Sequence, residues 1–291
     1  MAGPKKKSRA PSKSESEGSS NEESDSGTYH GQKVIHMNHV QEIQATFEGR
    51  NPEVQDFHGI KQLLNQLFLK AHIDLSQMSD LLIAQHGVGS VLKQSYGDSD
   101  DEDEDVEMSD EKDVFGIASV VNLGSHKETP CVQQFFSLLE ELSKKHADES
   151  IQTEIRKIVT EHSRLGFLVN ERFVNIPAQI SVPMLNSLSE EVDRMKKKDP
   201  SYDFEYYVMI CKTCRSKDNK DEVIFTNDEE EIFSKDADIG FEFSVANESD
   251  VGLGGRWLAE DKQVIPYRKV IMFKASKLKN IISKIALFVK P

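Results

Sequence analysis

The chain has 291 residues, of which 37% are hydrophobic, and it carries a formal net charge of −14 with only three cysteines. A chain of this length can bury a large core, and a small, odd number of cysteines argues against a disulfide scaffold. Because no stretch approaches the roughly 20 apolar residues of a membrane helix and none near the start resembles a secretory signal, we expect a soluble, intracellular protein with free thiols.

Residues 1–31 are rich in Ser, Glu, Gly, Lys and Asn and contain almost no large apolar side chain. Such a segment cannot offset the entropy of ordering, so we expect a disordered tail. The tail opens with a compact basic cluster, Lys5, Lys6, Lys7 and Arg9, of the kind that nuclear import receptors recognise. We therefore expect a nuclear protein. The alternative interpretation of the cluster is a lysine run that only increases solubility. A protein that also moves between nucleus and cytoplasm is a further alternative.

In the first part of the folded domain, the spacing of the apolar residues changes from that of a strand to that of a helix. Ile43, Ala45 and Phe47 alternate, which predicts a strand, and apolar residues between 60 and 68 then recur at helical spacing. The same stretch has the spacing of a leucine-rich export signal at Ile60, Leu63, Leu67 and Leu69. The buried face of a helix explains that spacing more simply. A short helix over 76–85 and a strand over 89–92 complete this part.

An acidic run dominates the next segment. Residues 98–113 contain eleven carboxylates and one lysine, so this run supplies −10 of the net charge. Mutual repulsion keeps such a run solvated, and we expect a disordered, partner-binding insertion at 97–113. The candidate partner-binding residues are Asp98, Asp100, Asp101, Glu102, Asp103, Glu104, Asp105 and Glu107. The apolar, β-branched stretch 114–121 that follows predicts a central strand covered on both faces.

The remaining elements alternate and then become a series of strands. Thr129 and Pro130 predict a helix start, Ser150 is expected to cap the next helix, and a strand from Leu165 to about Asn175 precedes a helix from about Ser181. Four strands are predicted over 205–211, 223–226, 239–245 and 264–273, with a last helix from Ser276. This order predicts an α/β domain, 32–291, with a single mixed twisted sheet and helices on both faces.

Catalytic motifs are missing from the sequence, which contains no Walker loop, no Gly-x-Ser-x-Gly elbow and no His-Glu-x-x-His. Cys211 and Cys214 have the spacing of half a zinc ribbon, but residues three apart on a strand point to opposite faces, so structural cysteines are expected. The segment Gln85–Gly89 is only loosely similar to an acetyl-CoA pyrophosphate loop, because a strand follows it instead of a helix. We therefore expect no catalytic residue, metal or cofactor.

The C-terminal segment is basic, with eight Lys or Arg residues and no acid from Lys262 to the end. A solvated surface is the ordinary interpretation of such a segment. The alternative is a nucleic-acid binder that uses Lys274, Lys277, Lys279 and Lys284.

Several segments together resemble the BCCIP family of nuclear proteins. They are Leu81–Gln85 with Gly89–Gln94, the acidic run, Val114–Gly116, the Pro-containing stretch Glu171–Ile180 with Pro183 and Met184, and Leu253–Trp257. They occur in the family's order, and the resemblance spans about residues 33–291.

The resemblance implies an architecture similar to GCN-type acetyltransferases without an established acetyltransferase activity. Family members are implicated in large ribosomal subunit assembly, as carriers of a basic ribosomal protein of the uL-fourteen class. Animal members are named for binding a homologous-recombination mediator and a cyclin-dependent kinase inhibitor, with links to DNA repair and the cell cycle.

We therefore expect a non-enzymatic nuclear carrier whose acidic run screens a cationic client until RNA replaces it. Arg256 and Trp257 are candidates for a docking surface on the folded domain. An acyl-CoA-dependent N-acetyltransferase with a divergent pocket is the alternative from another class, beside the nucleic-acid binder.

Overall fold

The computed structural model describes residues 46–95, 113–161, 164–217, 222–248 and 264–290, and all of them belong to one compact unit, Glu42–Pro291. They form an eight-stranded sheet with the order β1-β2-β3-β4-β5-β8-β7, in which β6 also pairs with β5. All paired strands are antiparallel except β4 and β5, so the predicted mixed sheet is confirmed. The strands are β1 (Thr46–Arg50), β2 (Ser90–Ser95), β3 (Gly116–Asn122), β4 (Leu165–Arg172), β5 (Tyr206–Ser216), β6 (Val223–Phe225), β7 (Ile239–Ser244) and β8 (Val264–Lys274).

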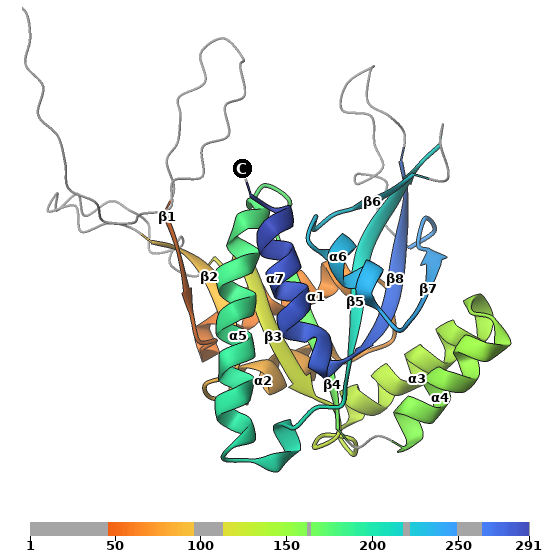
Figure 1. Ribbon diagram of the computed structural model, residues 1–291, viewed down its shortest axis with the longest axis horizontal. Helices are drawn as coiled ribbons and strands as arrows, with labels where there is room; N and C mark the ends of the chain where they lie inside the picture. The colour runs from red at the N-terminus through yellow and green to blue at the C-terminus, as the bar shows by residue number, and fades with distance from the viewer. Residues whose placement is uncertain (1–45, 96–112, 162–163, 218–221, 249–263, 291) are drawn as a thin grey trace, which may run out of the picture. The chain divides into compact units, whose positions relative to one another are not determined.

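Helices cover both faces of the sheet, as predicted (Figure 1). One face packs against α1 (Phe57–Phe68), α2 (Leu75–Ala84), α3 (Pro130–His146) and α4 (Glu149–Glu161). The other packs against α5 (Ser181–Lys196), α6 (Glu230–Asp236) and α7 (Leu278–Phe288). Within the described ranges, none of the helices has both the length and the apolar character needed to cross a membrane.

The apolar spacing in α1 belongs to the core. Ile60, Leu63 and Leu67 are all buried, and they lie in the same apolar cluster as the buried residues of α2 and α3. Burial of this stripe accounts for the spacing that also matches an export signal. Arg268 of β8 stabilises the end of α1, because its guanidinium donates to the carbonyl oxygens of Gln66 and Leu67.

Short 3-10 turns join several elements. They are Val54–Asp56 before α1, Ala178–Ile180 before α5, Pro200–Tyr202 before β5 and Ala275–Lys277 before α7. The last of these turns moves the start of the final helix from the predicted Ser276 to Leu278.

Three further boundaries or elements differ from the sequence prediction. Ser150 does not cap α4, because the Asp148 carboxylate accepts from the backbone N–H of Ile151 and the helix already begins at Glu149. β4 ends at Arg172 instead of Asn175, since a turn closes there with the N–H of Ile176 donating to the Phe173 carbonyl. Helix α6 was not predicted, because a short segment with few apolar residues shows no clear period.

The two parallel strands β4 and β5 pair over only a short length. Their register covers Leu165–Phe167 against Tyr206–Val208, whereas β4 stays paired with β3 up to Arg172 and β5 stays paired with β8 up to Ser216. The C-terminal parts of the two strands are therefore not joined by backbone pairing. We call the space between residues 169–172 and 209–213 the β4–β5 split.

The acidic run connects two neighbouring strands of the sheet. β2 and β3 pair antiparallel with Leu92 opposite Gly116, and most of the run lies between their ends. Residues 96–112 lie outside the described residues; the chain is described again from Asp113, three residues before β3, and Ser95 ends β2.

Candidate protein-interaction site

The predicted partner-binding and import residues lie outside the part of the chain that the structure describes. This holds for Asp98, Asp100, Asp101, Glu102, Asp103, Glu104, Asp105 and Glu107, for Arg256 and Trp257, and for Lys5, Lys6, Lys7 and Arg9. The described residues nevertheless show the surface on which the acidic run is anchored.

Three phenylalanines, one in β1, one just before β3 and one just after β4, form an aromatic cluster beside the attachment of the acidic run. The ring of Phe115 lies edge-on to Phe47 of β1, with centroids 5.5 Å apart, and to Phe173, which follows β4, at 6.3 Å. All three rings are partly exposed, and the neighbouring Val174 side chain is 83% exposed. The aromatic cluster (Phe47, Phe115 and Phe173) therefore offers an apolar contact at the base of an anionic segment.

Backbone contacts hold the aromatic cluster in place. The N–H of Phe115 donates to the Leu92 carbonyl, and the N–H of Phe173 donates to the Phe115 carbonyl, both at 2.9 Å. Between Phe115 and Asp113, the last residue of the acidic run, Val114 is buried in the core. The chain is thus fixed to the scaffold within two residues of the run.

A buried ion cluster stiffens the same end of the molecule. Arg50 of β1 donates to both oxygens of Asp56 at 2.8 and 2.9 Å, and Lys93 of β2 approaches that carboxylate at 3.4 Å. Asp56 is fully buried, so its charge depends on these two partners. The contacts tie β1, β2 and the turn before α1 together next to the aromatic cluster.

Side chains replace backbone pairing at the β4–β5 split. Glu229 accepts from Arg172 at 2.8 Å and from the Asn170 amide at 2.8 Å, and both of these partners belong to β4. Asn227 donates to the Asn170 carbonyl at 3.1 Å and to Glu230 at 2.8 Å. These residues carry no sequence signal, because charged and amide side chains ordinarily mark a surface.

Two carboxyl groups at the split, those of Glu171 and Glu230, have raised pKa values. Burial holds the pKa of Glu230 well above its usual range, and the nearby carboxylates of Glu171 and Glu229 add to that rise. Burial also raises the pKa of Glu171, while its contact with Lys212 works in the opposite direction. Both groups are buried.

The glycine loop before β2 is closed by a carboxylate. Gly87 and Gly89 have φ values of +79° and +93°, and the Gly89 N–H donates to Glu191 of α5 at 2.8 Å. A phosphate loop needs free N–H groups, whereas this one is bound by an anion. The arrangement gives no support to the acyl-CoA alternative.

The C-terminal lysines are neutralised by acids from neighbouring elements. Lys277 contacts Asp238 at 2.5 Å, Lys279 contacts Asp193 at 2.6 Å and Lys284 contacts Asp236 at 2.6 Å. Asp238 also accepts from the backbone N–H of Lys274 at 2.9 Å. The basic segment is therefore not a row of unpaired charges, and its prediction as a nucleic-acid surface gains no support.

The cysteines behave as structural residues. All three thiols are free, and Cys131 and Cys211 are buried. Cys211 belongs to the core on the α5–α7 side, whereas its strand neighbour Ile210 belongs to the opposite core, as expected for alternating side chains. Among the described residues, no three His, Cys, Asp or Glu side chains are grouped so that they could hold a metal ion.

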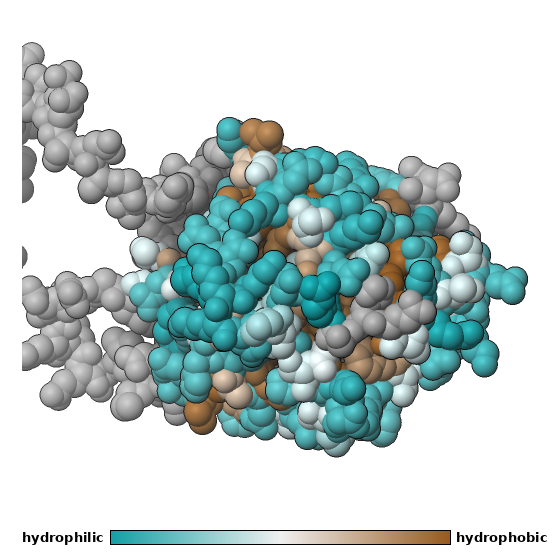
Figure 2. Space-filling view, turned by 60° about the horizontal axis from the view of Figure 1, so that its bottom comes forward, coloured by the Kyte–Doolittle hydropathy of each residue, from teal (hydrophilic) through white to brown (hydrophobic). Residues whose placement is uncertain are grey.

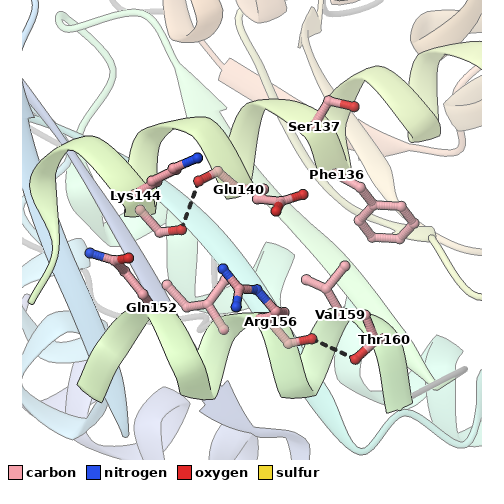
Figure 3. A pocket seen from close by; sticks show the side chains of 10 residues that line it. Phe136, Ser137, Glu140, Lys144, Gln152, Arg156, Val159 and Thr160 are labelled. Carbon is pink, nitrogen blue, oxygen red and sulfur yellow. Dashed lines mark hydrogen bonds between the residues drawn. The ribbon is translucent and has the colours of Figure 1, made fainter. Parts of the chain in front are cut away.

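A groove of about 130 Å³ lies between α3 and α4. Phe136 and Val159 form apolar parts of its lining, and Glu140, Lys144 and Arg156 carry its charges (Figure 3). In Figure 2, the bottom of the view in Figure 1 is turned toward the reader. Polar side chains dominate this face of the molecule, and apolar side chains form small separate groups on it. The groove thus combines opposite charges with apolar side chains.

Comparison with known families decides the relationship. The BCCIP family model matches residues 42–238. The chain belongs to the BCCIP family. BCCIP relatives include the Protein BCCIP homolog of Drosophila melanogaster, 42% identical over 254 residues with 86% of each chain covered. The BRCA2 and CDKN1A-interacting protein of Homo sapiens is 34% identical, with 84% of this chain and 81% of the relative covered.

A solved structure supports the fold of this BCCIP-family chain. The crystal structure of BCP1 from Saccharomyces cerevisiae aligns with a TM-score of 0.54, at 21% identity, covering 84% of this chain and 89% of the other. At that identity the likeness concerns the fold alone.

Proposed function

We propose that this chain is a non-enzymatic nuclear binding factor that carries a basic protein of the large ribosomal subunit. Binding of a recombination mediator and of a cyclin-dependent kinase inhibitor is part of the same proposal. The printed name of the human relative, an interactor of BRCA2 and CDKN1A, supports a role in protein binding. The architecture implied for the scaffold is that of GCN-type acetyltransferases, used here to present a binding surface.

The observation that carries the proposal is the position of the acidic run. The run joins the described chain at Asp113, two residues before Phe115 of the aromatic cluster, which supports a combination of long-range attraction and an apolar contact. Charge of one sign speeds the encounter with a cationic client, and buried aromatic side chains supply much of the binding energy in protein interfaces. Arg256 and Trp257 are further docking residues in this proposal.

The same charges explain release. A ribosomal protein binds RNA through cations, and each cation that meets a phosphate releases counterions. Carboxylates of the run would occupy these cations in the carrier complex and give way to RNA phosphates at the assembly site. Import through Lys5, Lys6, Lys7 and Arg9 would bring the complex to the nucleus.

The test is a matched neutralisation experiment with a purified basic ribosomal protein of the uL-fourteen class. One variant carries Asp101→Asn, Glu102→Gln and Asp103→Asn, and its control carries Glu140→Gln, Glu141→Gln and Glu154→Gln on the exposed surface of α3 and α4. Each variant loses three negative charges. The proposal predicts weaker binding for the first variant and nearly unchanged binding for the control. Equal affinities of the two variants would exclude the run as the binding element.

A further inference from the structure

An amide and a carboxyl group face each other at the β4–β5 split with complementary atoms left over. Asn227 Nδ2 donates to Glu230 Oε1 at 2.8 Å, and both residues are buried. Among the described residues, Asn227 Oδ1 and Glu230 Oε2 have no hydrogen-bond partner. Two acceptor oxygens without a donor are therefore buried on the same pair of side chains.

One proton would satisfy both atoms. A protonated carboxyl group has an O–H donor as well as an acceptor oxygen, which matches the amide of asparagine atom for atom. We propose that Glu230 holds a proton at neutral pH and donates it from Oε2 to Asn227 Oδ1, so that the two side chains form a closed, doubly hydrogen-bonded ring. No covalent bond changes, and the proton comes from water when the chain folds.

The orientation of the Asn227 amide is fixed by its other contact. Its Nδ2 also donates to the Asn170 carbonyl at 3.1 Å, so a flipped amide would bring oxygen against two acceptors. The ring lies at the start of α6, and the hydrogen bond from Asn227 to the Asn170 carbonyl joins it to β4, where the backbone pairing with β5 has ended. This proton-dependent contact is independent of the proposed client-binding function.

The surrounding charges favour the neutral form on balance. From β4, Glu171 opposes a second negative charge, and Glu229 beside it does the same, while Lys212 of β5 and the Asn227 amide favour ionisation. Cys211 of β5, which is in hydrogen-bond contact with Glu230, adds no charge, because burial holds the pKa of its thiol well above the usual range. Complete burial of Glu230 and the two neighbouring carboxylates favour the neutral acid. Together they outweigh Lys212 and the hydrogen bond from Asn227, which favour the ionised form.

The adjacent Glu229 provides a matched control. It is equally buried, but it is held by two nitrogens of Arg172 and by Asn170, as an ionised carboxylate is. Glutamine copies the shape and the donor of a protonated Glu230, whereas at residue 229 it places an amide N–H against donors. Glu230→Gln and Glu229→Gln should therefore have opposite outcomes.

The experiment measures urea midpoints of the full chain and both variants from acid to alkaline pH. Well below pH ~4.3, Glu230→Gln should keep the midpoint of the parent chain, and at neutral pH it should raise it, because glutamine takes up no proton on folding. Glu229→Gln should lower the midpoint at neutral pH or prevent folding. An unfolded glutamate releases its proton at about pH 4.3, whereas folded Glu230 retains it. The contribution of Glu230 to the free energy of unfolding is therefore complete below that pH and declines as the pH rises. Glu230→Gln should remove this part of the decline.

A second measurement needs no variant. The side-chain carboxyl carbon of Glu230, assigned by triple-resonance NMR in the unmodified chain, should show the chemical shift of a protonated carboxyl at neutral pH. A carboxylate shift there would overturn the proposal. A Glu230→Gln chain that unfolds, or that loses as much stability as Glu229→Gln, would overturn it as well.

Discussion

Phe115 and Phe173 are joined twice, by a 2.9 Å hydrogen bond from the Phe173 N–H to the Phe115 carbonyl and by edge-on contact of their rings at 6.3 Å. Phe115 lies two residues beyond the acidic run, and Phe173 begins the turn after β4. The end of the acidic run is thereby attached to the turn that follows β4. An affinity contribution from these rings can be separated from that of the carboxylates.

Phe115→Ala should weaken binding of the basic ribosomal client by about tenfold, which corresponds to the loss of one aromatic contact worth about 1.4 kcal/mol. The dependence of affinity on salt should stay the same, because no charge is lost. Titration calorimetry at several salt concentrations measures both quantities. Phe288→Ala, at an exposed phenylalanine near the end of α7, is the control and should leave affinity unchanged. A changed salt dependence in Phe115→Ala would show that the ring acts by positioning the run.

Arg172→Ala should destabilise the protein by about 3–5 kcal/mol, because it leaves the Glu229 carboxylate buried without its cation. Urea unfolding followed by circular dichroism measures the loss. Arg164→Ala removes a cation from exposed pairs with Asp203 and Glu205 and should cost only about 0–1 kcal/mol. Similar losses in the two variants would contradict a bridging role for the Arg172–Glu229 pair.

Gly89→Ala should cost more stability than Gly87→Ala, although both glycines have positive φ. A Cβ at Gly89 would lie 2.3 Å from the Ser119 hydroxyl oxygen and 2.5 Å from its Cβ, whereas a Cβ at Gly87 meets nothing within 4 Å. Gly87→Ala should therefore show only the left-handed backbone penalty of about 1–2 kcal/mol. Thermal unfolding of the two variants gives the comparison, and equal losses would mean that Ser119 moves aside without cost.

Reversing Lys277, Lys279 and Lys284 to Glu should not abolish an RNA affinity of the chain. These lysines already contact Asp238, Asp193 and Asp236, so few of their charges remain for phosphates. The same change should lower stability, since each aspartate would then face a like charge. Filter binding to a structured RNA, read beside the unfolding midpoint, checks both outcomes. RNA binding that is strong in the parent and lost in the variant would revive the nucleic-acid alternative.

Local pattern was sufficient for most of the fold. When one face of an element is buried, its apolar residues recur with the period of that element. This recurrence predicts the helix from Ile60 to Phe68 and the strand from Ile239 to Val245. The central strand predicted at 114–121, observed at Gly116–Asn122, was recognisable for another reason, because a continuous apolar, β-branched stretch indicates a strand covered on both faces. Boundaries were less certain, as the early end of β4 and the cap at Asp148 show.

The polar contacts could not be predicted, because they join residues far apart in the chain. Arg172 and Glu229 are 57 positions apart, and Gly89 and Glu191 are 102 apart. In the sequence, Glu229 and Glu230 are indistinguishable from surface glutamates, and α6 is too short to show a period. The aromatic cluster was missed for a similar reason, since its three rings come from segments far apart in the chain.

The most direct test of the binding proposal measures the affinity for the ribosomal client at several salt concentrations and takes the slope of log affinity against log salt concentration. The full chain is compared with a variant in which a neutral Gly/Ser linker of equal length replaces residues 98–113. The account predicts a weaker affinity at low salt and a clearly shallower slope once the carboxylates are gone. An unchanged affinity together with an unchanged slope would contradict it.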